Sequence, residues 1–93
     1  MADDAEVPPF DPGPAEYVYA ALADHVALRI TLGDLRPGAR LPGERDLAAE
    51  YGVAIGTARR AVEELRERGL VVTLPAKGTF IVVPQPPEDG EEA

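Results

Sequence analysis

The sequence predicts a mainly helical domain with a small β hairpin, arranged as a winged helix-turn-helix. Two short helical patterns join at Gly52, and a strand, a Lys-Gly turn and a second strand follow them. Small residues at Ala48 and Ala58 flank that join, as the close crossing of two helices requires. The domain is expected over residues 14–83, with three helices and a wing of two to three antiparallel strands.

The first helix is expected over residues 14–32. Pro14 suits its opening turn, Glu16 lies where the helix dipole favours a carboxylate, and Gly33 suits the position after the last turn. The apolar residues at helical spacing that should face the core are Tyr19, Leu22, Val26 and Ile30. A second apolar stripe beside them either packs under the wing or the terminal arms or forms a self-association surface. This second stripe consists of Tyr17, Ala21, Leu28 and Leu32.

Two further helices are expected to form the helix-turn-helix. The second spans residues 44–51 with Gly43 as its N-cap, and the third spans residues 55–68 and ends at Gly69. The side chains of the third helix that should face the core are Ala58, Ala61, Val62 and Leu65.

The wing is expected directly after the third helix. Residues 70–74, rich in Val and Leu, predict a buried strand, and residues 75–78 have turn composition. Residues 79–83 return as a second strand, which Pro84 stops. Residues 39–41, in the connector before the second helix, are expected to pair briefly as a further strand.

The net charge of −8 is confined to the two ends of the chain. Residues 1–16 hold five acidic side chains and residues 84–93 hold four, with no basic side chain in either range. Residues 17–83 hold nine basic and eight acidic side chains, so the predicted domain is nearly neutral. Acidic, Pro-rich ends bury too little apolar surface to become ordered, so residues 1–13 and 84–93 are expected to be disordered. The overall charge therefore does not exclude a nucleic-acid partner.

Composition argues against several classes of protein. The chain has no cysteine for a disulfide or a thiolate, and its single histidine, His25, is expected to be structural or solvated. No apolar run approaches the ~20 residues of a membrane span, and the acidic, Pro-rich N-terminus is unlike a signal peptide. The acidic residues show no paired geometry. We therefore expect a cytoplasmic protein that is not an enzyme, uses no cofactor or metal and has no membrane partner.

Four segments of the chain resemble the DNA-binding domain of the GntR family, nearer to its HutC-type members. They are GDLRPGARLP (33–42), GERDLAAEYGV (43–53), TARRAVEELRERGLV (57–71) and KGTFIV (77–82), in the order and spacing of that family. With the first helix included, the resemblance covers about residues 17–83. It implies a winged-helix transcription regulator, usually a repressor of local genes, whose partner is double-stranded DNA.

The resemblance assigns DNA contacts only where positions match. Arg45 matches an arginine at the start of the second helix that typically contacts the operator, and Arg59 matches another in the third helix. Thr57 matches a position that often contacts a phosphate. The wing tip, which enters the minor groove in the family, corresponds here to Lys77 and Gly78, followed by Thr79.

The chain also departs from the family pattern. Ala54, Ile55 and Gly56 stand where the family often has Ser-Arg-Asn or Ser-Arg-Thr, so one base-contacting arginine is absent and the operator sequence stays open. Ile55 either touches a thymine methyl group or packs against the turn. Gly43 replaces the usual serine cap, and Ala76 replaces a wing residue that is commonly Gly.

The exposed face of the third helix predicts how it approaches DNA. Opposite the core stripe lie Gly56, Arg60, Glu63 and Glu67, with Arg59 alongside. Glu63 and Glu67 would repel phosphates if the helix lay lengthwise in the groove, so we expect an end-on approach. The residues expected deepest in the major groove are Gly56, Thr57, Arg59 and Arg60. The alternative is a solvated helix with ordinary Arg60–Glu64 and Glu64–Arg68 pairs, worth about 0.2–0.5 kcal/mol each.

Three further cations have two interpretations each. Arg36 and Arg40, in the connector before the second helix, either bind phosphates or stand in solvent. Lys77, at a hairpin tip, either contacts the minor groove or only adds solubility.

The leading hypothesis is a sequence-specific DNA-binding transcription regulator that acts as a repressor. Only ten residues follow Val83, so we expect no effector domain and no small-molecule effector. A homodimer is then expected either through Tyr17, Ala21 and Leu28 or only on DNA. The alternative is a protein-interaction module, an antirepressor or co-regulator, which uses the same surface. The acidic arms suit a basic partner, or they compete with phosphates for the basic face of the domain.

Overall fold

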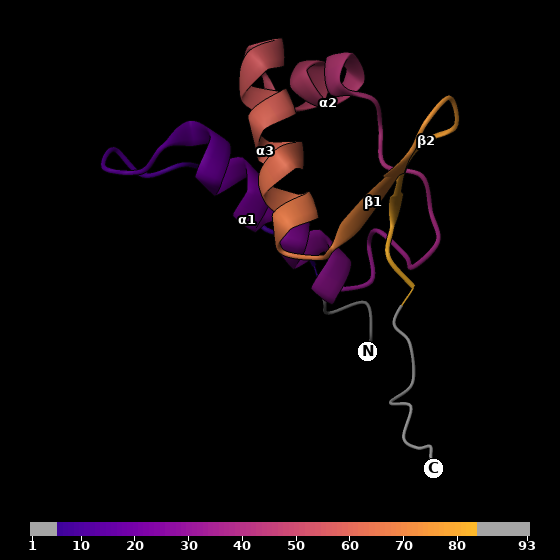
Figure 1. Cartoon of the computed structure of the whole chain (residues 1–93). Helices are drawn as coiled ribbons and strands as arrows, with labels where there is room; N and C mark the ends of the chain where they lie inside the picture. The colour runs from indigo at the N-terminus through magenta and orange to yellow at the C-terminus, as the bar shows by residue number, and fades with distance from the viewer. Residues whose placement is uncertain (1–5, 84–93) are drawn as a thin grey trace.

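The computed structural model describes residues 6–83. Its elements are α1 (Val18–Thr31), α2 (Glu44–Tyr51), α3 (Ile55–Glu67), β1 (Val71–Leu74) and β2 (Gly78–Ile81). The three helices pack together, and the hairpin lies beside α3 (Figure 1). This arrangement confirms the predicted winged helix-turn-helix. The disorder expected for residues 1–5 and 84–93 lies outside the described residues.

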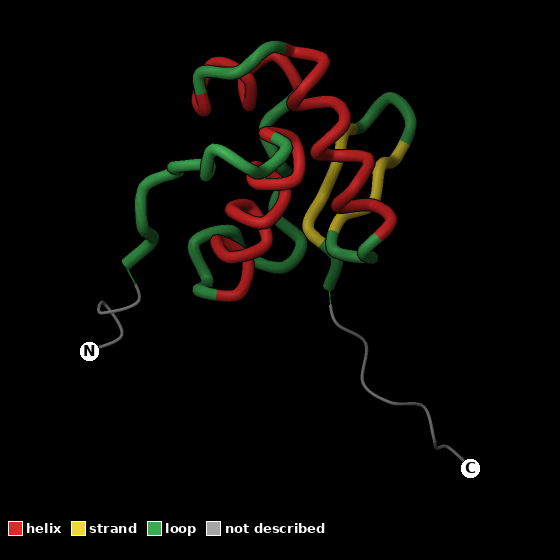
Figure 2. Tube along the Cα trace, turned by 90° about the vertical axis from the view of Figure 1, so that its left-hand side faces the viewer, coloured by secondary structure: helices red, strands yellow, loops and turns green. Residues whose placement is uncertain are grey.

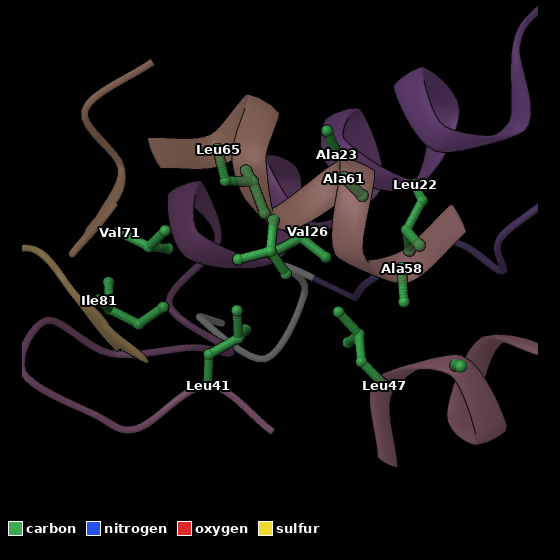
Figure 3. Close-up of a cluster of buried hydrophobic side chains, with 12 residues drawn as sticks. Leu22, Ala23, Val26, Leu41, Leu47, Ala58, Ala61, Leu65, Val71 and Ile81 are labelled. Atoms are coloured by element: carbon green, nitrogen blue, oxygen red, sulfur yellow. The ribbon is translucent and has the colours of Figure 1, made fainter. Parts of the chain in front are cut away.

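One apolar core joins the helices to the wing (Figure 3). Leu22 and Val26 of α1, Leu47 of α2 and Ile81 of β2 are fully buried in it. The stripe predicted on α3 is buried as expected and consists of Ala58, Ala61, Val62 and Leu65. Because its first members are alanines, α1 and α2 can both pack closely against α3. Each fully buried Leu stabilises the fold by about 1.5–3 kcal/mol relative to an exposed one.

Helix α1 begins at Val18, later than the expected start at Pro14. Glu16 does not lie in its first turn. The Glu16 carboxylate instead accepts a hydrogen bond from the backbone N–H of Gly13 at 2.6 Å, and the Glu16 N–H donates to the Gly13 carbonyl at 3.2 Å. These two bonds close a local turn that competes with the helix for the same backbone groups. Tyr17, extended at φ −73° and ψ 134°, becomes the N-cap.

The bend between α2 and α3 is made at Gly52, as expected. Gly52 has φ +68° and ψ +35°, the left-handed region in which an L side chain costs about 1–2 kcal/mol. The N–H of Val53 donates to the carbonyl of Ala48 at 3.0 Å and satisfies the end of α2. Val53 then packs against the core as the apolar anchor of the turn.

The wing has three strands if its short edge is included. β1 and β2 are antiparallel and place Thr73 opposite Thr79. The N–H of Leu41 donates to the Thr79 carbonyl, and the N–H of Ile81 donates to the Ala39 carbonyl, both at 2.8 Å. Residues 39–41 therefore pair with the outer side of β2, which confirms the expected short strand.

The tip of the wing is a type II turn. The N–H of Lys77 donates to the Leu74 carbonyl at 2.9 Å, Pro75 takes the second position, and Ala76 takes the third with φ +65°. Glycine is the usual residue at that third position, because the backbone there has positive φ. The chain thus accepts a strained alanine at the point where the wing projects furthest.

Residues 8–10 lie against the helices, in contrast to the disorder expected for residues 1–13. The ring of Phe10 meets those of His25 and Tyr51 edge-on, with centroids 5.7 and 5.0 Å away. His25 Nε2 lies 2.7 Å from the Pro8 carbonyl oxygen, and His25 Nδ1 lies 2.7 Å from the Tyr51 hydroxyl. Figure 2 shows this segment as a loop along the helical side of the molecule. His25 is therefore structural: it ties the segment to α1 and α2.

Arg29 forms a second tie between α1 and α2. Its Nε donates to Asp34 at 2.8 Å, and its Nη1 donates to Glu50 at 3.1 Å and to the Tyr51 hydroxyl at 3.0 Å. Burial alone lowers the pKa of Arg29, but the hydrogen bonds to Asp34 and Tyr51 outweigh it and raise that pKa above its ordinary value. Burial raises the pKa of Tyr51, and the bond from Arg29 opposes that shift. The cluster fixes α2 on α1 and so fixes the angle at which the helix-turn-helix is presented.

Candidate nucleic-acid interface

Arg59 links the start of α2 to the exposed flank of α3. Its Nε donates to the Glu44 carboxylate at 3.1 Å, and the side chains of Arg59 and Glu44 are 56% and 38% exposed. Arg45 is the next residue of the same first turn of α2 and is also exposed. The structure thus brings Arg45 and Arg59, both predicted to contact DNA, to the same end of the helix-turn-helix.

The beginning of α3 is open to solvent. Ala54 is its N-cap and makes no side-chain capping bond, so the first N–H groups of the helix have no side-chain acceptor there. Gly56 is exposed, and a Cβ placed on it would meet nothing within 4 Å. Thr57 is half-buried, while Ile55 keeps 38% of its surface exposed. Ile55 is therefore accessible to a thymine methyl group, one of its two interpretations.

Arg60 points to a different part of the surface from Arg59. Its guanidinium lies over the ring of Tyr19 on α1, 4.2 Å from the centroid, and Nη2 donates to the Tyr19 hydroxyl at 3.4 Å. The bond to Tyr19 raises the pKa of Arg60. Glu64 pairs with Arg68 at 3.1 Å, which confirms one of the two i,i+4 pairs. The structure separates Arg60 from α2 and the wing, although the sequence grouped it with Arg59.

The wing gathers four of the predicted residues, Arg40, Lys77, Gly78 and Thr79. A Cβ placed on Gly78 would lie 2.7 Å from Arg40 Nε, so the Arg40 side chain lies directly against the wing backbone. Lys77, at the turn, is exposed. Thr79 is half-buried, and its hydroxyl is 2.9 Å from that of Thr73. The turn of the hairpin, α2 and the start of α3 all lie toward the same end of the molecule (Figure 1, top).

Arg66 was not among the residues predicted to bind DNA. Its Nη1 donates to Thr73 Oγ1 at 2.8 Å and so bridges α3 to β1. It lies two helical turns after Arg59 and therefore shares the flank of α3 that faces α2 and the wing. The seven-residue spacing from Arg59 is the signal in the sequence that could have identified Arg66. The contacts predicted on α3 all lie in its first two turns, from Gly56 to Arg60, and Arg66 lies beyond them.

The other predicted positions lie apart from this end. Arg36 is exposed in the connector. Among the suggested self-association residues, Tyr17 is 76% exposed, Ala21 is buried, and Leu28 is half-buried. A hollow of about 210 Å³ near Ala21 and Leu28 is lined in part by Phe10. The N-terminal segment therefore borders this stripe, and self-association through it stays a prediction.

Several cations of the described domain have no carboxylate partner within it. Among residues 6–83, the cations with no carboxylate of the same range within 4 Å are Arg36, Arg40, Arg45, Arg60, Arg66 and Lys77. The same range contains no cluster of three or more His, Cys, Asp or Glu side chains suited to a metal ion. None of its helices is both long and apolar enough to span a bilayer.

Comparison with known proteins identifies the family. A model described as bacterial regulatory proteins, gntR family, matches residues 18–81. The chain belongs to the GntR family. It is 38% identical over 64 residues to SmoD, an HTH-type transcriptional regulator of Agrobacterium fabrum, across 69% of this chain and 27% of the relative. It is 36% identical over 67 residues to the histidine utilization repressor of Klebsiella aerogenes, across 72% of this chain and 28% of the relative. This GntR-family chain spans about a quarter of the length of such curated relatives.

Solved structures of GntR-family proteins share its fold. YtrA from Sulfolobus acidocaldarius superposes with a TM-score of 0.74 at 26% identity, over 86% of this chain and 84% of YtrA. The DNA-binding domain of AraR, in complex with its operator ORX1, superposes with a TM-score of 0.70 at 26% identity. That match covers 82% of this chain and 96% of the AraR domain. The winged helix-turn-helix described above is thus the fold of this family.

Proposed function

We propose that the chain is a sequence-specific DNA-binding regulator that represses transcription, with α3 in the major groove and the wing in the minor groove of an operator duplex. The observation that carries the proposal is that three segments with exposed basic side chains lie close to the same end of the molecule. The start of α3, α2 and the hairpin turn lie toward one end of the molecule (Figure 1), and these segments carry the exposed Arg59, Arg45 and Lys77. The AraR domain, whose fold matches, was captured on an operator.

The start of α3 enters the groove first in this proposal. Gly56 lets the backbone approach closely, because it has no side chain to be accommodated. Arg59 makes the main base contact, since a guanidinium can donate two hydrogen bonds to guanine. Arg45 and Arg40 bind phosphates on either side and set the register of the protein. Arg60 joins these contacts only if its side chain leaves Tyr19.

The same comparisons favour DNA binding over the alternative of a protein-interaction module. The relatives reported above are transcription regulators, so we propose a regulatory rather than a catalytic role. One module of this size buries roughly 600–1,000 Å² on DNA, which gives weak discrimination. We therefore propose that two copies occupy two half-sites, and the spacing of those half-sites would report their symmetry.

Selection of bound duplexes from a random pool, followed by titration of the best one, tests the proposal. Four to six phosphate contacts predict a log–log salt slope of about −4 to −5. Arg59→Gln should weaken the selected duplex by about 1–3 kcal/mol and relax discrimination at one base pair. Arg68→Gln removes the same charge from the opposite flank of α3 and should leave that discrimination unchanged. A chain that binds no duplex even at low salt is not a DNA-binding regulator.

A further inference from the structure

A bridge of hydrogen bonds links α3 to both strands of the wing. Arg66 Nη1 donates to Thr73 Oγ1 at 2.8 Å, and Thr73 Oγ1 lies 2.9 Å from Thr79 Oγ1 on the paired strand. Side chains alternate along a strand, so Thr73 shares a face with buried Val71, and Thr79 shares it with buried Ile81. Both hydroxyls are therefore directed toward α3. Thr73 binds the guanidinium of Arg66, and Thr79 is hydrogen-bonded to Thr73.

This guanidinium has donors to spare. An arginine side chain carries five N–H donors, and the bond to Thr73 uses one of them. No carboxylate of residues 6–83 lies within 4 Å of it, whereas Arg59 and Arg68 both have such partners. Arg66 is also exposed, so the remaining donors face solvent. Arg66 is therefore held in position by Thr73, has no carboxylate partner among the described residues and keeps free N–H donors. A cation of this kind is suited to bind an anion.

The position of Arg66 indicates which anion this is, and the inference rests on the proposed function. A major groove that holds α3 and a minor groove that holds the wing are separated by one sugar-phosphate strand. That strand must pass between α3 and the hairpin, where the Arg66–Thr73 bridge lies. We propose that Arg66 binds a backbone phosphate of this strand, with Thr73 and Thr79 as positioning residues that hold its side chain.

The salt dependence of duplex binding measures this contact. Loss of one phosphate contact changes the log–log slope by about 0.9, so Arg66→Gln should give a shallower slope than the wild type by that amount. The ratio of wild-type to variant affinity should then shrink about 3.5-fold between 0.05 and 0.2 M salt. The loss should be similar on selected and unrelated duplexes, because a phosphate carries no sequence information.

Three further variants separate phosphate binding from a purely structural bridge. Arg68→Gln removes an equal charge on the opposite flank, where Arg68 pairs with Asp24 and Glu64, and should keep the wild-type slope. Arg66→Lys keeps the charge and should keep most of the slope. Thr73→Val keeps Arg66 but removes the hydroxyl that positions its guanidinium, and it should weaken duplex binding less than Arg66→Gln does. Thermal unfolding of each variant shows that it is folded.

Two results would overturn the assignment. If Arg66→Gln lowers thermal stability but keeps the wild-type slope, the bridge only braces the wing against α3. If Arg66→Gln and Arg68→Gln change the slope equally, the effect is one of general charge. Failure of the wild-type chain to bind any duplex would instead contradict the proposed function itself, so the two failures are distinguishable.

Discussion

A glycine and an alanine of the domain both adopt the left-handed backbone conformation, with positive φ. Gly52, at the bend of the helix-turn-helix, has φ +68°, and Ala76, at the tip of the wing, has φ +65°. In this left-handed region the Cβ of an L residue lies too close to the backbone, at a cost of about 1–2 kcal/mol. Glycine avoids that cost but loses more entropy on folding, by roughly 0.4–1 kcal/mol. The strain term is the larger, so glycine is expected to be the more stable residue at both positions.

Exchange of these two residues provides matched tests. Ala76→Gly should raise the free energy of unfolding by up to about 1 kcal/mol, which shifts the melting temperature of a domain this small by roughly 4–8 °C per kcal/mol. Gly52→Ala should lower it by a similar amount, although no atom lies within 4 Å of the added Cβ. Calorimetry of the two variants measures both changes. A loss of stability in Ala76→Gly would show that chain entropy outweighs the strain at the wing tip.

At the scale of elements, the sequence predicted what depends on periodicity and turn residues. The bounds of α2, the buried stripe of α3 and the edge strand at residues 39–41 are confirmed. The predicted start of α1 was wrong, because the Glu16 carboxylate accepts a hydrogen bond from Gly13 and closes a turn there. Helix propensity does not report a bond of this kind. The direction of the Arg60 side chain depends on Tyr19, which lies far away in the sequence and close in space. Pattern alone cannot supply contacts of that kind.

The N-terminal segment shows the same limit. Its acidic, Pro-rich composition predicts disorder, but a single aromatic ring, Phe10, finds two partners in His25 and Tyr51. Those partners come from α1 and α2, so their juxtaposition exists only in the folded domain. The segment is thus an appendage that the tertiary structure orders, and not an element with a preference of its own.

Phe10→Ala tests whether this docking stabilises the domain. Loss of a half-buried ring with two edge contacts should lower the free energy of unfolding by about 1–2 kcal/mol, less than the 3–5 kcal/mol of a fully buried Phe. Phe10→Leu keeps apolar volume and should lose about half as much. Chemical denaturation measures both, and the NMR resonances of the His25 ring should shift in Phe10→Ala. Wild-type stability in Phe10→Ala would mean that residues 8–10 are as free as their composition predicts.

At the scale of the whole molecule, the arrangement of charge opposes the proposed partner. The chain carries a net charge of −8, but residues 17–83 are nearly neutral and hold all nine basic side chains. Repulsion of DNA by the acidic ends acts over the Debye length, about 30 Å at 0.01 M salt and about 10 Å at 0.1 M. Close contacts made by Arg45 or Arg59 on a matched operator are screened much less. The ends should therefore weaken nonspecific binding more than specific binding.

Removal of residues 84–93 tests this effect of charge. The truncated chain loses four carboxylates and should bind an unrelated duplex more tightly at 0.01 M salt, with little change at 0.2 M. Its affinity for a selected operator should rise less, so the ratio of specific to nonspecific affinity should fall.

A full-length control neutralises the same carboxylates by substitution with Gln or Asn, at Glu88, Asp89, Glu91 and Glu92. If truncation alone raises nonspecific affinity and the neutralised chain does not, then the tail acts by its volume. If neither change has an effect at 0.01 M salt, then the acidic C-terminal segment does not compete with phosphates, and the discrimination of the protein comes from the helix-turn-helix and the wing alone.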